Sequence, residues 1–202
     1  VPTAKELELE RYGGFILSYN GGRIVDCSTG KTIYEKTIPH KAISGIYSQV
    51  RGLDVALMTY EGDTIITENP RDAYVDKESF INKMKVKGVG NFLEYVTFPV
   101  VKCLVAADGG YLATVEEKLK GYFGSQLSIY RSEPYFLEIM PKDIDKASSL
   151  ERLRLLLGLE REGIAACGDG LNDISMIQYA GLGIAMANAQ EAVKRVCDFV
   201  TK

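Results

Sequence analysis

The residues after Pro141 alternate between short apolar runs and stretches with helical spacing of apolar positions. Leu150, Leu153, Leu156 and Leu157 recur at this spacing and Gly158 follows them, which predicts a helix from Ala147 to Leu157. The same reasoning predicts a strand at 164–167, a helix at 172–179, a strand at 183–186, a helix at 189–197 and a strand at 199–201. Strand and helix in strict alternation are typical of an α/β fold with a doubly wound, Rossmann-like parallel sheet.

The residues before Pro141 show a different pattern, in which β-strand runs are separated by turn residues. Strands are predicted at 15–19, 23–26 and 32–34. From Pro39 onward helices are predicted at 41–50, 72–84 and 111–122, a loop at 88–90, and strands at 55–60, 64–67, 100–106, 127–131 and 135–140. Strands paired by turns, with helical stretches between them, predict an α+β module with an open sheet.

Composition narrows the function classes. The 202 residues carry 24 basic and 27 acidic side chains, a net charge of -3, which argues against a nucleic-acid-binding protein. Hydrophobic residues at 46% and charged residues at 25% are typical of a folded chain, and no apolar run approaches the roughly 20 residues that span a bilayer. The opening residues lack the basic start and apolar stretch of a signal peptide.

The cysteines indicate the cellular compartment of the protein. Cys27, Cys103, Cys167 and Cys197 are widely spaced, and the chain has a single histidine, His40, so no zinc site is expected. We interpret the cysteines as buried, reduced thiols of a cytoplasmic protein.

The candidate site is the segment from Gly168 to Asp173, which follows the predicted strand at 164–167. Ligands of open parallel sheets bind at the carboxyl ends of strands. Asp169 and Asp173 offer the hard oxygen ligands that suit Mg²⁺, and Asn172 offers an amide donor to a phosphate oxygen. The ordinary alternative is that the Asp and Asn side chains only cap the next helix.

Two other site types fit this segment less well. A dinucleotide fingerprint would need glycine at position 173, and a calcium loop would need a different order of acidic residues. Lys146 is a further candidate, because it lies at a junction between loop and helix and its charge would suit a phosphoryl group. An isolated lysine is usually solvated, and the residues alone leave both interpretations open.

A resemblance to a known family begins at this segment. Gly168-Asp169-Gly170-Leu171-Asn172-Asp173, followed by Gly183-Ile184-Ala185-Met186-Ala187-Asn188-Ala189, resembles the last motif of the haloacid dehalogenase superfamily, and more closely that of its Cof-type phosphatases. Leu137 to Pro141, leading to Lys146, resembles the third motif. Ser18-Tyr19-Asn20-Gly21-Gly22 resembles the segment before the cap domain.

The resemblance implies a Mg²⁺-dependent phosphatase with a phosphoaspartate intermediate. By position, it implies that Asp169 ligates the metal, that Asp173 is an acidic catalytic residue supporting the metal's water shell, and that Lys146, Asn172 and Asn20 hold the phosphate. It also implies a core formed by residues 1–39 and 139–202. Residues 40–138 would form an inserted α+β cap of the C2B type, which closes over the substrate.

One departure from the family pattern is serious. The nucleophile motif Asp-x-Asp-Gly-Thr does not occur in the 202 residues, and Asp143-Ile144-Asp145 lacks the following Gly-Thr and the preceding apolar strand. The simplest account is a truncated chain, so we expect the 202 residues alone to be inactive. For the complete protein we expect a phosphatase of small phosphorylated metabolites, sugar phosphates above all. A phosphomutase of the same superfamily and a non-enzymatic module that binds phosphate esters are the alternatives. The particular substrate and the oligomeric state stay open.

Overall fold

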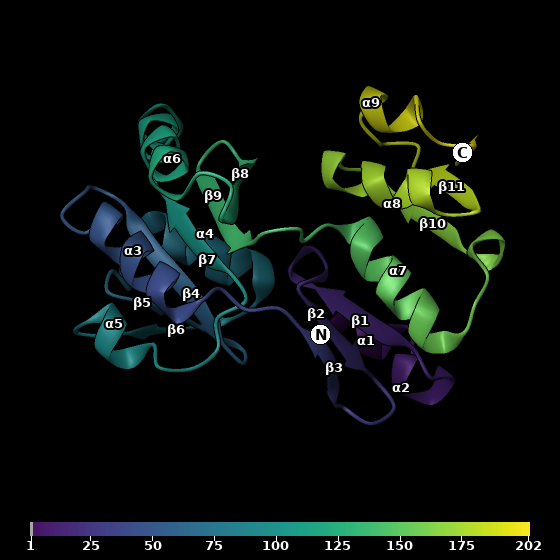
Figure 1. The fold of residues 1–202 in the computed structure, drawn as a ribbon, viewed down its shortest axis with the longest axis horizontal. Helices are drawn as coiled ribbons and strands as arrows, with labels where there is room; N and C mark the ends of the chain where they lie inside the picture. The colour runs from purple at the N-terminus through teal and green to yellow at the C-terminus, as the bar shows by residue number, and fades with distance from the viewer. Residues whose placement is uncertain (1) are drawn as a thin grey trace. The chain divides into compact units, whose positions relative to one another are not determined.

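The computed structural model describes residues 2–202, and the chain forms two compact units (Figure 1). The first unit consists of Val1–Glu35 and Asp143–Lys202, and the second consists of Lys36–Lys142. The second unit ends at Lys142, beyond the boundary expected at residue 138. The reason is that all of strand β9 (Phe136–Pro141) belongs to the sheet of this unit.

The first unit contains two separate three-stranded sheets. Strands β1 (Phe15–Ser18), β2 (Arg23–Asp26) and β3 (Thr32–Glu35) are antiparallel, in the order β1-β2-β3. Strands β10 (Ala165–Gly168), β11 (Leu182–Ala185) and β12 (Phe199–Val200) are parallel, in the order β10-β11-β12. The predicted alternation of strands and helices, and with it the α/β fold class, is confirmed.

Helices and turns connect these strands. They are α1 (Pro2–Glu6), α2 (Leu9–Tyr12), α7 (Lys146–Leu157), α8 (Ile174–Tyr179) and α9 (Glu191–Lys194), with the 3-10 turns η1 (Tyr19–Gly21), η2 (Arg161–Gly163) and η3 (Leu171–Asp173). Helix α7 contacts both η1 and α8. The prediction of a helix at 189–197 was too long, since α9 has four residues and buries only Val193.

The second unit is built on one six-stranded sheet. Its strands are β4 (Ala56–Glu61), β5 (Thr64–Thr67), β6 (Lys85–Gly88), β7 (Cys103–Ala106), β8 (Leu127–Glu133) and β9, in the order β6-β5-β4-β7-β9-β8. Its helices are α3 (His40–Val50), α4 (Ala73–Asn82), α5 (Phe92–Tyr95) and α6 (Gly109–Phe123). Residues from α3, α5 and α6 join the larger core cluster on one face of the sheet, and Val75 of α4 joins the smaller cluster on the other.

Two elements of this unit were not predicted. Strand β6 includes Gly88, which was expected in a loop, and most of its side chains are exposed, so it lacks the apolar alternation of a half-buried strand. Helix α5 is only one turn long, and the Asn91 side chain caps it by accepting from two backbone N–H groups.

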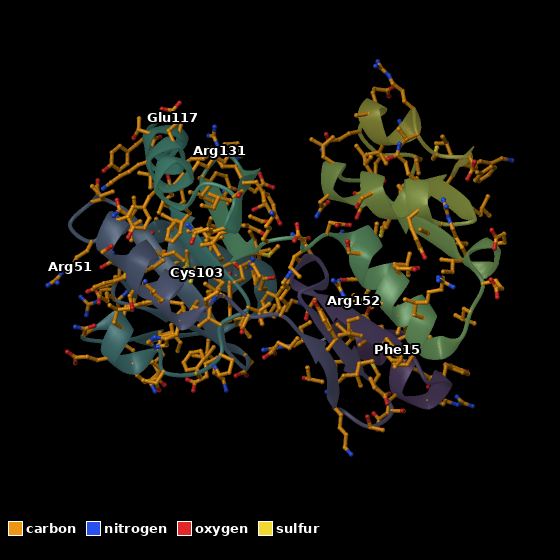
Figure 2. All side chains as sticks on the ribbon, in the orientation of Figure 1. Phe15, Arg51, Cys103, Glu117, Arg131 and Arg152 are labelled. Atoms are coloured by element: carbon orange, nitrogen blue, oxygen red, sulfur yellow. The ribbon has the colours of Figure 1, made fainter. Side chains whose placement is uncertain are left out.

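The cysteine interpretation is only partly correct. All four cysteines are free, and Cys103 is buried in the interior of the second unit (Figure 2). Cys167 is exposed, because Ala166 and Gly168 are the buried residues of the alternating strand β10. Among residues 2–202, no helix has both the length and the apolar composition that crossing a bilayer requires.

Candidate functional site

Helix α7 begins at Lys146 because the preceding Asp145 caps it. Asp145 Oδ1 accepts from the backbone N–H of Ser148 at 3.0 Å, and Oδ2 accepts from the Ser148 hydroxyl at 2.6 Å. Burial acts to raise the pKa of Asp145, but these hydrogen bonds hold it below its usual range. Asp145 therefore serves to start the helix that carries Lys146.

Asp173 is the most constrained side chain of the candidate site. Its Oδ1 accepts a hydrogen bond from Lys146 Nζ, and its Oδ2 accepts from the backbone N–H groups of Asp169 and Gly170, both at 3.0 Å. The residue is 5% exposed. Burial acts to raise its pKa, yet the Lys146 ammonium and the two N–H groups together keep the pKa below its usual value. Asp173 is thus held as a carboxylate at neutral pH.

Gly168 allows Asp173 to lie against the end of β10. A Cβ atom on residue 168 would lie 2.4 Å from the Asp173 Cβ and 2.7 Å from its Cγ, far inside van der Waals contact. Glycine is the residue that permits so close an approach of backbone and side chain. The glycine before Asp169 is therefore required by packing.

Asp169 projects from the carboxyl end of β10 and is exposed to solvent. Its Oδ2 accepts from the side-chain amide of Asn188 at 3.3 Å. Asn188 was not among the predicted site residues. It follows strand β11, whose Ala185 pairs with Gly168 in parallel register, so the carboxyl ends of the two strands lie together. The parallel arrangement of these two strands, which the sequence predicted, was the signal that could have pointed to a residue after β11 as a neighbour of Asp169.

The two asparagines predicted to hold phosphate also meet. Asn172 Nδ2 donates to Asn20 Oδ1 at 3.2 Å, which joins η3 to η1 across 152 positions of the sequence. Tyr19 and Asn20 both have left-handed backbone conformations, with φ of 54° and 50°. The structure thus gathers Lys146, Asp173 and Asp169 with these asparagines within the first unit.

The donor set can be tested for a divalent cation. In the described part of the chain, no group of three or more His, Cys, Asp or Glu side chains is placed to hold a metal ion. The exposed Asp169 carboxylate suits Mg²⁺, which commonly takes one or two carboxylates plus waters and a phosphate. Both oxygens of Asp173 already accept N–H bonds, so its arrangement fits support of the metal's water shell better than direct ligation.

The Arg131 side chain makes its polar contacts with other residues of the second unit (Figure 2). Its Nε pairs with a Glu116 oxygen at 2.9 Å, and its Nη1 donates to the Gly109 carbonyl at 3.2 Å. These contacts tie strand β8 to helix α6, which is a structural use of the guanidinium.

Several known proteins are similar to this chain in sequence or in structure. The haloacid dehalogenase-like hydrolase family matches residues 1–202. A haloacid dehalogenase-like hydrolase from Bacteroides thetaiotaomicron has a similar structure, with a TM-score of 0.96, 46% identity, and coverage of 99% of this chain and 75% of that one. The phosphatase BT1666 from the same organism gives a TM-score of 0.76 at 28% identity, over 93% of this chain and 68% of its own.

A third relative is similar over a shorter range. It is the 5-amino-6-(5-phospho-D-ribitylamino)uracil phosphatase YcsE of Bacillus subtilis, 45% identical over 76 residues, which are 38% of this chain and 30% of its own. Because the family match extends over all 202 residues, the chain belongs to the haloacid dehalogenase-like hydrolases.

Proposed function

We propose that the protein is a Mg²⁺-dependent phosphatase of small phosphorylated metabolites, with sugar phosphates as the first class to test. The observation that carries the proposal is the cluster at the carboxyl end of β10, where Lys146, Asn172 and Asn20 accompany the exposed carboxylate of Asp169. Cationic and amide donors beside an oxygen ligand for a metal are what a phosphoryl group requires. The phosphorylated ribityl compound in the name of the YcsE relative supports a sugar-like substrate.

In this proposal each residue of the cluster has a distinct task. Lys146 and the two asparagines, Asn172 and Asn20, hold phosphate oxygens by charge and by hydrogen bonds. Asp169 ligates Mg²⁺, which when bound would neutralise phosphate charge. Asp173 keeps the Lys146 ammonium and the backbone of residues 169–170 in place and supports the water shell of the metal.

The attacking group is an aspartate of an Asp-x-Asp-Gly-Thr motif, as the family resemblance implies. Attack of its carboxylate on phosphorus would form a phosphoaspartate and release the alcohol, and water would then release phosphate. This motif does not occur in the 202 residues. We therefore expect no hydrolysis by these residues alone.

We further propose that the first unit is the catalytic core and the second is the cap domain that selects the substrate. The core would then consist of residues 1–35 and 143–202, and the cap of 36–142. The division of the chain into two compact units, one with a parallel sheet and one with a largely antiparallel sheet, supports this assignment.

The test is phosphate release by the complete gene product from a panel of sugar phosphates, with and without Mg²⁺. We expect Mg²⁺-dependent release, and its loss in the Asp169→Ala variant with the fold retained. Absence of turnover on every compound, together with tight binding of phosphate esters, would favour the binding module instead. Recovery of an isomeric sugar phosphate rather than free phosphate would favour a phosphomutase.

A further inference from the structure

The three elements that carry the proposed phosphate-binding residues are cross-linked in pairs. The Lys146–Asp173 ion pair joins α7 to η3, and the Asn172–Asn20 hydrogen bond joins η3 to η1. The third link joins η1 back to α7, where the Ser149 hydroxyl donates to the Gly21 carbonyl at 2.6 Å. The three links close a ring of three elements.

Ser149 differs from the other members of this ring because it is inaccessible. It is 0% exposed, whereas Lys146 is partly exposed and Asn172 is exposed. Because its side chain is fully buried, a ligand held by Lys146 would not touch it. Its hydroxyl donates to the backbone of η1, at the residue next to Asn20.

The contact between Ser149 and Gly21 is as close as backbone and side chain allow. Gly21 has φ of 95°, and a Cβ atom there would lie 1.9 Å from Ser149 Oγ. Tyr19 and Asn20 are both left-handed, a conformation that is uncommon in residues other than glycine. Backbone in such conformations persists only when surrounding contacts fix it. The Ser149 hydrogen bond is one such contact, at the residue next to Asn20.

We propose that Ser149 is a positioning residue: through its bond to the Gly21 carbonyl, it fixes the η1 turn so that Asn20 faces Asn172 and shares a phosphate with Lys146. The proposal rests on the proposed phosphate-binding roles of Lys146 and Asn20. Loss of the hydroxyl would leave the Gly21 carbonyl without this partner and would free the turn to relax toward ordinary backbone angles.

The test compares Ser149→Ala with Ser148→Ala in the 202-residue chain. The control removes a hydroxyl hydrogen bond of the same 2.6 Å length from the same turn of α7, but that bond goes to Asp145 and not to η1. Two quantities are measured: the NMR signals of the Asn20 and Asn172 side-chain amides, and the affinity for inorganic phosphate. We expect Ser149→Ala to shift both amide signals and weaken phosphate binding about tenfold, which is ~1.4 kcal/mol, with little change in Ser148→Ala.

Unchanged Asn20 signals in Ser149→Ala would overturn the proposal, and so would equal loss of phosphate affinity in both variants. Shifted signals with unchanged phosphate affinity would also overturn it. Should Ser149→Ala not fold, Ser149→Cys keeps a weaker donor of similar shape, and we expect a smaller effect in the same direction. A wild-type chain that binds no phosphate would contradict the proposed function, while the amide signals would still show whether Ser149 positions Asn20.

Discussion

Replacing Asp173 by asparagine is the most informative single perturbation of the site, because the change is nearly isosteric. The two carboxylate oxygens face donors on both sides, Lys146 on one and the N–H groups of residues 169 and 170 on the other. An asparagine amide has only one oxygen. Whichever way it is turned, its NH₂ group points at donors and one side of the arrangement is broken.

The magnitude follows from these contacts. A hydrogen bond to a charged group contributes about 1.5–3 kcal/mol, and the variant loses the ion pair or the two N–H bonds. Lys146 is 31% exposed and can be rehydrated, which reduces the loss on that side. We therefore expect about 3 kcal/mol of destabilisation in the first unit, which corresponds to roughly 6–12 °C in Tm for a chain of this size.

The assay is urea and thermal unfolding of wild type and Asp173→Asn. The matched control is Asp169→Asn, because Asp169 is exposed and the change there should alter stability by less than about 0.5 kcal/mol. An Asp173→Asn protein as stable as wild type would refute the reasoning. A loss of equal size in Asp169→Asn would also refute it, since the effect would then not arise from the buried contacts.

Three further predictions concern the pH dependence of stability, the reactivity of the cysteines and the packing of the glycines. Because the pKa of Asp173 is lowered in the folded state, the stability that its carboxylate gives to the fold should be complete above about pH 4 and disappear as the pH falls through that lowered pKa. The urea unfolding curves of wild type and Asp173→Asn should therefore converge in acid. Iodoacetamide followed by mass spectrometry should label Cys167 in the native protein and spare Cys103, whose thiol pKa burial raises to about 12; rapid native labelling of Cys103 would contradict its burial. Gly168→Ala should lower Tm by an amount similar to Asp173→Asn, whereas Gly163→Ala, with open space at the Cβ position, should leave Tm nearly unchanged.

Much of the first unit could be predicted from its sequence because its elements are signalled locally. The leucine spacing ended by Gly158 predicted α7, and the apolar runs before Gly168 and after Gly181 predicted two strands of the parallel sheet. Parallel strands bring their carboxyl ends to one edge, so the segment after β10 could be recognised as a candidate site.

Long-range hydrogen bonds could not be predicted in this way. The bond from Ser149 to Gly21 joins residues 128 positions apart, and the bond from Asn188 to Asp169 depends on the register of β10 and β11. Nothing in the local pattern distinguishes Ser149 from the neighbouring Ser148. Strand β6 was missed for another reason, since an exposed edge strand lacks the alternation that reveals a buried one.

The central claim is that the end of β10 forms a phosphate site assisted by Mg²⁺. The most direct measurement is a calorimetric titration of the protein with inorganic phosphate at increasing Mg²⁺, for wild type, Asp169→Ala and Lys146→Ala. We predict that Mg²⁺ strengthens phosphate binding in wild type, that Asp169→Ala removes this enhancement, and that Lys146→Ala weakens phosphate binding but keeps the response to Mg²⁺. Phosphate affinity that is independent of Mg²⁺, or an Asp169→Ala protein that responds as wild type does, would contradict the claim.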